Sequence, residues 1–150
     1  MTVSYDWFTD VFLDKITEYD FVYLAEEDRQ AIVDGYMKRA CSSFSEVCKQ
    51  DIVNGDDDAR VFTFKDTATA GEIEEIIDIV TDGMLVQWLR PHLYNQENLR
   101  NQLNTADFSQ YSPAELTYRI RTTYEMCRKQ FISRMREYSY RYGDLTDLSL

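Results

Sequence analysis

The sequence predicts a mainly α-helical protein, a bundle built around three long helices. Apolar residues recur every three or four positions in three long stretches. Glycine and proline are scarce, with five and two residues among 150, and helix-capping patterns precede two of the stretches. A length of 150 residues with 44% hydrophobic side chains is typical of one globular domain. We therefore expect a single helical domain over residues 1–142 and a flexible, polar C-terminal tail over residues 143–150.

The N-terminal part is expected to hold a short helix and the first long one. Residues 4–16 carry Trp7, Phe8, Val11, Phe12 and Ile16 at helical spacing, which predicts a short amphipathic helix. The first long helix is predicted over residues 25–48, where Gly35 suggests close packing against another helix. Its apolar stripe consists of Val33, Tyr36, Met37, Ala40, Phe44 and Val47.

A turn and a short extended segment should follow. Residues 54–59 read Asn-Gly-Asp-Asp-Asp-Ala, a composition typical of turns. Residues 61–64 read Val-Phe-Thr-Phe and are the one β-like run in the sequence. We predict one short extended segment over residues 61–64.

The second long helix, over residues 70–90, is the candidate core helix. Thr69 and Glu72 form a capping box, in which each side chain is expected to accept a hydrogen bond from the other's backbone. Pro91 should end the helix, because proline has no backbone N–H to donate. Apolar residues cover most of the helix, as is usual at the centre of a bundle; they are Ile73, Ile76, Ile77, Ile79, Val80, Met84, Leu85, Val86, Trp88 and Leu89.

The third long helix is predicted over residues 113–142, after a short polar helix over residues 95–104. Ser112 and Glu115 form a second capping box, and Pro113 suits the first helical position. The apolar stripe of this last helix consists of Leu116, Ile120, Tyr124, Cys127, Phe131, Met135, Tyr138 and Tyr142.

No pattern indicates catalysis, a metal or a cofactor, and we predict that the protein is not an enzyme. His92, the single histidine, is expected to bond free carbonyls at a helix end, and no nucleophile pattern accompanies it. Residues 56–58 are three aspartates without the spacing of a calcium loop. Cys41, Cys48 and Cys127 are odd in number and lie in helical patterns, so we expect buried, reduced thiols.

Neither a membrane span nor a secretory signal is expected. No apolar run reaches the ~18 residues that a membrane-spanning helix needs. The first residues lack a basic segment followed by an apolar one.

Charge is distributed unevenly along the chain, whose net charge is −11. Residues 1–75 hold 18 acidic and 7 basic side chains, whereas residues 76–150 hold 9 of each. Residues 113–142 alone hold 7 basic and 3 acidic side chains, a net +4. The overall negative charge disfavours general wrapping of nucleic acid. Either solvated faces simply differ in charge, or an acidic part of one copy meets a basic part of another copy or of a partner.

The last helix interleaves arginine with tyrosine, and both are enriched at the energetic centres of protein interfaces. The alternative is an ordinary surface helix with pairs such as Glu125 and Lys129. We also expect leucines of the tail to insert into a groove of a neighbouring molecule. The candidate interface residues are Arg119, Arg121, Arg128, Arg136, Tyr138, Tyr140, Arg141, Leu145, Leu148 and Leu150.

Residues 70–142 resemble a known family. The similar segments are WLRPHL at 88–93, ENL at 97–99, LNTADFSQYSPAEL at 103–116 and REYSYRY at 136–142. They resemble the C-terminal half of the head–tail connectors of tailed bacteriophages, also called head-completion or neck adaptor proteins. The plan of an acidic chain of about 150 residues with a long final helix is similar too.

The resemblance implies a structural role in the virion neck, after assembly in the cytoplasm of the host bacterium. Proteins of this family form a homo-oligomeric ring, usually a dodecamer, beneath the portal protein. The ring extends the DNA channel, through which DNA passes without sequence-specific binding, and docks the tail or the next neck protein. It implies no enzymatic activity and no cofactor. The alternatives are another phage neck or tail-completion protein, a small cytosolic helical regulator that binds one protein partner, or an enzyme using His92 or a carboxylate pair.

Overall fold

A computed structural model describes residues 2–16, 29–48, 52–64, 68–94 and 113–142 of the chain. It confirms a mainly α-helical protein, to which a small three-stranded sheet is added. In chain order the elements are β1 (Thr2–Ser4), α1 (Tyr5–Ile16), α2 (Arg29–Cys48), β2 (Ile52–Asp56), β3 (Val61–Phe64), α3 (Ala70–Tyr94) and α5 (Pro113–Tyr142).

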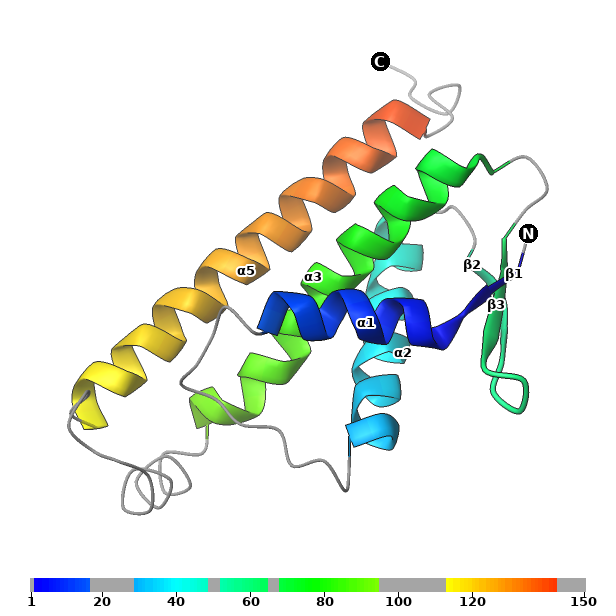
Figure 1. The fold of residues 1–150 in the computed structure, drawn as a ribbon. Helices are drawn as coiled ribbons and strands as arrows, with labels where there is room; N and C mark the ends of the chain where they lie inside the picture. The colour runs from blue at the N-terminus through cyan, green and yellow to red at the C-terminus, as the bar shows by residue number, and fades with distance from the viewer. Residues whose placement is uncertain (1, 17–28, 49–51, 65–67, 95–112, 143–150) are drawn as a thin grey trace.

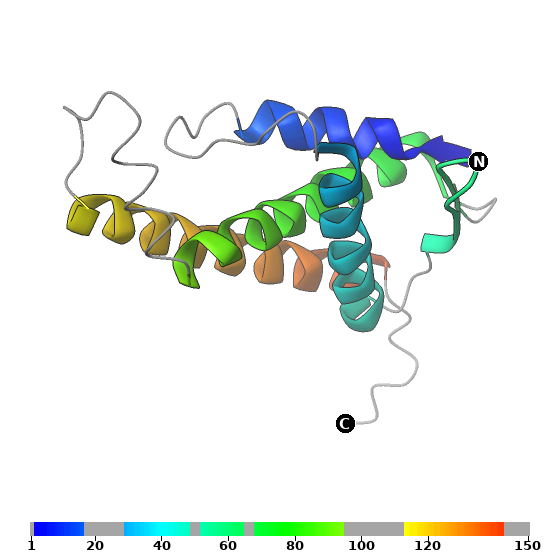
Figure 2. The same ribbon diagram turned by 90° about the horizontal axis from the view of Figure 1, so that it is seen from below.

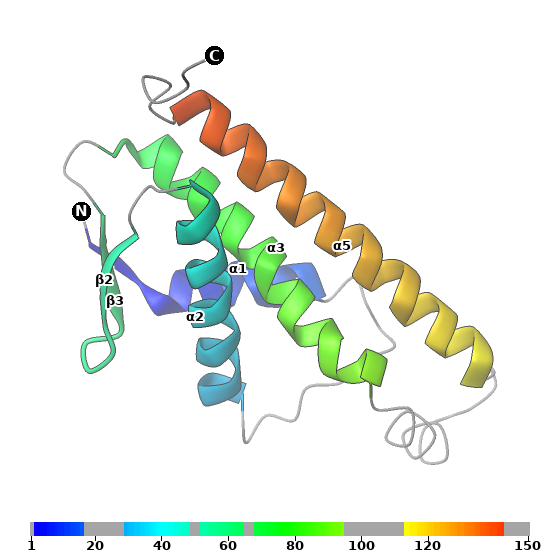
Figure 3. The same cartoon turned by 180° about the vertical axis from the view of Figure 1, so that it is seen from behind.

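Helix α3 lies at the centre of the molecule, as its nearly all-round apolar surface predicted. Helix α1 crosses it on one side and α2 on the other, while α5 runs antiparallel beside it (Figures 1 and 3). Seen from below, α3 lies between α1 and the C-terminal half of α5 (Figure 2). Every predicted core residue of α3 is buried except Val86, which is partly buried.

Where their side chains are described, which leaves out Leu116, the predicted apolar stripes match the core with three exceptions. In α2, Val47 is 43% exposed. The buried residue that follows Phe44 is Cys48, four positions later on the same face of the helix. In α1, Trp7 is 38% exposed, and Tyr5 fills the core together with Phe8 and Phe12. In α5, Tyr142 is 39% exposed.

The predicted end of α3 is wrong, because the helix passes Pro91 and continues to Tyr94. Proline at position 91 removes one hydrogen bond, the one that its N–H would have donated to Gln87. With only three residues left in the helix, this loss does not end it.

The capping box at the start of α3 is formed in part. The Glu72 backbone N–H donates to Thr69 Oγ1 over 3.2 Å, as predicted. The Glu72 carboxylate does not return the bond to Thr69 and instead accepts one from the Tyr138 hydroxyl over 2.7 Å. The start of α3 is thereby joined to the end of α5.

The sequence revealed one of the three strands. β3 lies between β1 and β2 and pairs with both in antiparallel fashion. Residues 54–56, predicted as part of a turn, belong to β2, and the turn covers residues 57–60, where Arg60 has φ 55°. An Asn-Gly-Asp segment disfavours a strand. Here Gly55 and Asp56 pair with β3, and the register skips Asn54. Gly55 fits at this place, where a Cβ would come within 2.5 Å of the Tyr5 hydroxyl oxygen.

Helices α3 and α5 approach closely at Gly83. A Cβ at this position would overlap the ring of Phe131. The sequence had suggested such an approach at Gly35, and that suggestion is wrong. The nearest side-chain atom to a Cβ at Gly35 is Arg39 Nη2 of the same helix, 3.9 Å away.

We expect alanine substitutions at these two glycines to have opposite effects on stability. Gly83→Ala should destabilise the fold by about 1–3 kcal/mol, because Phe131 must shift in a packed core. Gly35→Ala should stabilise it by about 0.5–1 kcal/mol, because alanine favours the helix and no other helix is displaced. Urea denaturation of both variants measures the two changes, and equal values would contradict the close approach at Gly83.

Some predictions fall outside the described part of the chain. These are the start of the first long helix at 25–28, the short helix at 95–104, the cap at Ser112, the ring of His92, and the tail at 143–150 with Leu145, Leu148 and Leu150.

Candidate interaction surface

Four charged side chains join α1, α3 and α5. Lys15 Nζ of α1 lies 2.7 Å from Asp78 Oδ1 and 2.8 Å from Asp82 Oδ1, both on α3. Arg134 of α5 pairs with Asp78 and, over 2.5 Å, with Asp82 Oδ2. Lys15 also donates to Thr81 Oγ1 over 2.8 Å. The four residues Lys15, Asp78, Asp82 and Arg134, called here the ion cluster, carry no net charge.

A cavity of about 300 Å³ lies beside the ion cluster and is lined also by Leu85, Cys127 and Gln130. Burial raises the pKa of Asp78, but hydrogen bonds from Lys15 and Arg134 outweigh it, and the pKa lies below the ordinary value. Asp78 is therefore ionised at neutral pH. Each cation of the ion cluster already pairs with two carboxylates. The geometry of the cluster is therefore that of ion pairs that hold the three helices together.

We expect Arg134→Met to destabilise the fold by about 1–3 kcal/mol, because it leaves the Asp82 carboxylate, whose side chain is 8% exposed, with fewer partners. Arg136→Met is the matched control. It lies two residues further along the same helix, is exposed, and should change stability by no more than about 0.5 kcal/mol. Thermal melting followed by circular dichroism compares them. Equal melting temperatures would show that the ion cluster contributes little.

Two of the predicted interface residues, Tyr138 and Arg141, have partners on α3. Tyr138 is 0% exposed, its ring centroid lies 5.2 Å from that of Phe44, and its hydroxyl donates to Glu72. Its assignment to an interface is wrong, because residue 138 continues the buried row of α5. Arg141 forms an ion pair with Glu75 of α3.

A basic and aromatic surface remains on the side of α5 that faces away from the core. We call it the α5 outer face. Tyr118 and Tyr140 are 70% and 73% exposed, and Met126 is 52% exposed. Arg119, next to this surface, lies 3.8 Å from Glu115 of its own helix. The residues of the α5 outer face are Tyr118, Arg121, Met126, Arg128, Lys129, Arg136 and Tyr140.

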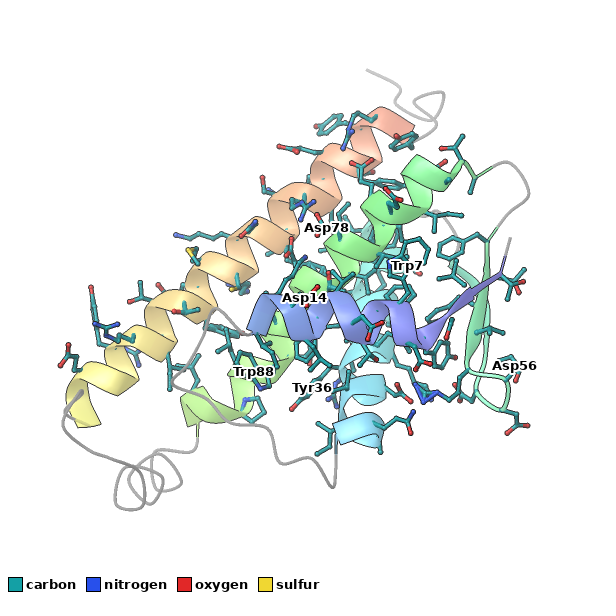
Figure 4. All side chains as sticks on the ribbon, in the orientation of Figure 1. Trp7, Asp14, Tyr36, Asp56, Asp78 and Trp88 are labelled. Atoms are coloured by element: carbon teal, nitrogen blue, oxygen red, sulfur yellow. The ribbon has the colours of Figure 1, made fainter. Side chains whose placement is uncertain are left out.

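The four cations of the α5 outer face are exposed and have no charged partner in the part of the chain that the structure describes. This separates them from Arg134 and Arg141, which α3 neutralises. Side chains project along α5 on the side away from α3 (Figure 4).

An acidic surface lies on α1, and the sequence patterns had not singled it out. Asp6, Asp10 and Asp14 are exposed and follow one another at intervals of four residues, with Trp7 beside them. These four residues are called the α1 outer face. Asp6 lies 3.3 Å from Arg60 Nη2. The signal was present in the sequence, because this row alternates with the buried row of Phe8 and Phe12.

Within the described residues, no group of three or more histidine, cysteine or acidic side chains could hold a metal ion. Cys41, Cys48 and Cys127 are buried and form no disulfide, as predicted, and burial raises the pKa of Cys41 to about 12 and that of Cys48 to about 11. Such thiols are protonated at neutral pH and are poor nucleophiles. Among the described helices, none is both long and apolar enough to cross a membrane.

Comparisons of the chain with models of protein families, with curated proteins and with solved structures found no match.

Proposed function

We propose that the chain is a helical module that works by binding other proteins. More specifically, we propose that it is a head–tail adaptor of a tailed bacteriophage. Its copies would form a ring beneath the portal protein, extend the DNA channel and dock the tail or the next neck protein. The resemblance of residues 70–142 to the connector family supports this role.

The α5 outer face is the observation that carries the proposal. Exposed tyrosine and arginine side chains on a rigid helix are the kind of surface that protein interfaces favour. Helix α5 has 30 residues and would span about 45 Å, so this surface is long enough to contact more than one neighbour. Its cations have no charged partner within the described chain, and a binding partner can supply one.

The experiment is negative-stain microscopy of the purified protein, alone and mixed with the portal protein encoded in the same gene block. The proposal predicts rings, or portal particles with an added ring at one end. A protein that stays monomeric and leaves the portal particles unchanged at high concentration would contradict it. A one-to-one complex with an unrelated bacterial protein would instead favour a small regulator.

A further inference from the structure

We infer that the α1 outer face of one copy binds the α5 outer face of the next copy. This inference rests on the proposed ring and names the contact between its subunits. The partner is a second copy of this chain, and the recognition is that of carboxylates by arginine and lysine beside exposed aromatic rings.

The acids of α1 do not serve the stability of their own helix. Asp6 and Asp10 are four residues apart, as are Asp10 and Asp14, and like charges at this spacing destabilise a helix. Aspartate is also a poor helix former in a helix interior. Only the one in the first turn, Asp6, gains from the helix dipole. Asp6 lies 3.3 Å from Arg60 Nη2 of its own chain, whereas Asp10 is exposed and has no charged partner among the described residues, so a cation of another molecule can pair with it.

The two outer faces match in spacing as well as in charge. Asp6 and Asp14 are eight residues apart, and so are Arg128 and Arg136, which corresponds to about 12 Å along either helix. Helix α1 can therefore lie along α5 with carboxylates opposite guanidinium groups at two points. Trp7 at 38% exposure and Tyr140 at 73% supply apolar area of the kind found at interface centres.

The placement of the two faces determines the kind of assembly. The two outer faces belong to different helices, α1 and α5, and α3 lies between α1 and the C-terminal half of α5 (Figure 2). A contact between two different surfaces is heterologous: each pair leaves one face free at either end. Such a contact forms a ring where the rotation between neighbouring copies closes, as the proposed function requires, and the same two faces serve every subunit.

Site-directed disulfide formation tests the contact. One chain carries Asp6→Cys or Asp14→Cys, the positions that lie opposite Arg128 when the two helices run parallel or antiparallel, and the other chain carries Arg128→Cys; the three native cysteines are buried. After mixing at assembly concentration with a mild oxidant, we expect one of the two pairs to give a linked heterodimer at least about fivefold more abundant than linked homodimers of either variant. The matched control replaces the cysteine on α1 by Glu74→Cys, an exposed position on α3 outside both faces. Equal linking by the control and the test pair would overturn the inference.

A second experiment exchanges the charges of the two outer faces. Asp10→Lys with Asp14→Lys, or Arg128→Glu with Arg136→Glu, should each weaken self-association at least about tenfold. Mixing the two variants should restore assembly with the two chains alternating, because each face then meets a face of opposite charge, and combining all four changes in one chain should restore it as well. No restoration, in a combined variant whose melting shows an intact fold, would overturn the inference.

The two proposals fail in different ways. A parent protein that never assembles, alone or with portal, removes the proposed function and the contact together. A parent that assembles without linking position 6 or position 14 to position 128 removes the contact and leaves the function.

Discussion

Replacing Phe131 or Ile77 by aspartate is expected to unfold the protein. Both side chains are buried in the hydrophobic core, with exposures of 5% and 1%. A carboxylate placed there without a partner costs several kcal/mol, compared with a total stability of about 5–15 kcal/mol for a domain of this size. Circular dichroism at 25 °C should show the loss of most helical signal.

Tyr140→Asp is the matched control for this prediction. It makes a comparable change nine residues further along α5, where the side chain is 73% exposed. The control should melt within a few degrees of the parent. If Phe131→Asp and Ile77→Asp also melt like the parent, the core between α3 and α5 is not the one described here.

Helical periodicity was sufficient to predict most of the fold. The helix predicted over residues 113–142 coincides with α5, and the all-round apolar surface of residues 70–90 identified the central helix. Local sequence patterns did not predict the strands whose formation depends on pairing with residues distant in the chain. β1 has three residues, and β2 contains Asn54, Gly55 and Asp56; both are held by pairing with β3 rather than by their own preference.

The candidate interaction surface was predicted only in part, for a similar reason. Seven basic residues on α5 look alike in sequence, but Arg134 and Arg141 meet acids of α3 that lie more than fifty positions earlier in the chain. Sequence spacing cannot show such pairs. It predicted Tyr138 both as part of the apolar stripe and as an interface residue. The stripe was the correct prediction, because this residue lies three positions after the buried Met135 and seven after the buried Phe131.

Reversing Arg121, Arg128 and Arg136 to glutamate is expected to abolish assembly while leaving the fold intact. All three are exposed on α5 and lack charged partners in the described chain, so the monomer loses little. Where a partner is desolvated at an interface, loss of one charge costs about 2–5 kcal/mol. Every copy of a ring uses the same contact, and the effect is repeated at each subunit boundary. Arg90→Glu, at an exposed position on α3, is the control and should assemble like the parent.

Sedimentation velocity of the parent and the triple variant between about 0.05 and 0.5 M salt tests the account most directly. Over this range the Debye length falls from roughly 14 to 4 Å. We predict that the parent forms large oligomers that loosen as salt rises and that the triple variant sediments as a monomer throughout, with unchanged circular dichroism. If the parent alone is monomeric, the same comparison is made with portal protein present. Identical size distributions for the two proteins at every salt concentration would contradict the role of the α5 outer face.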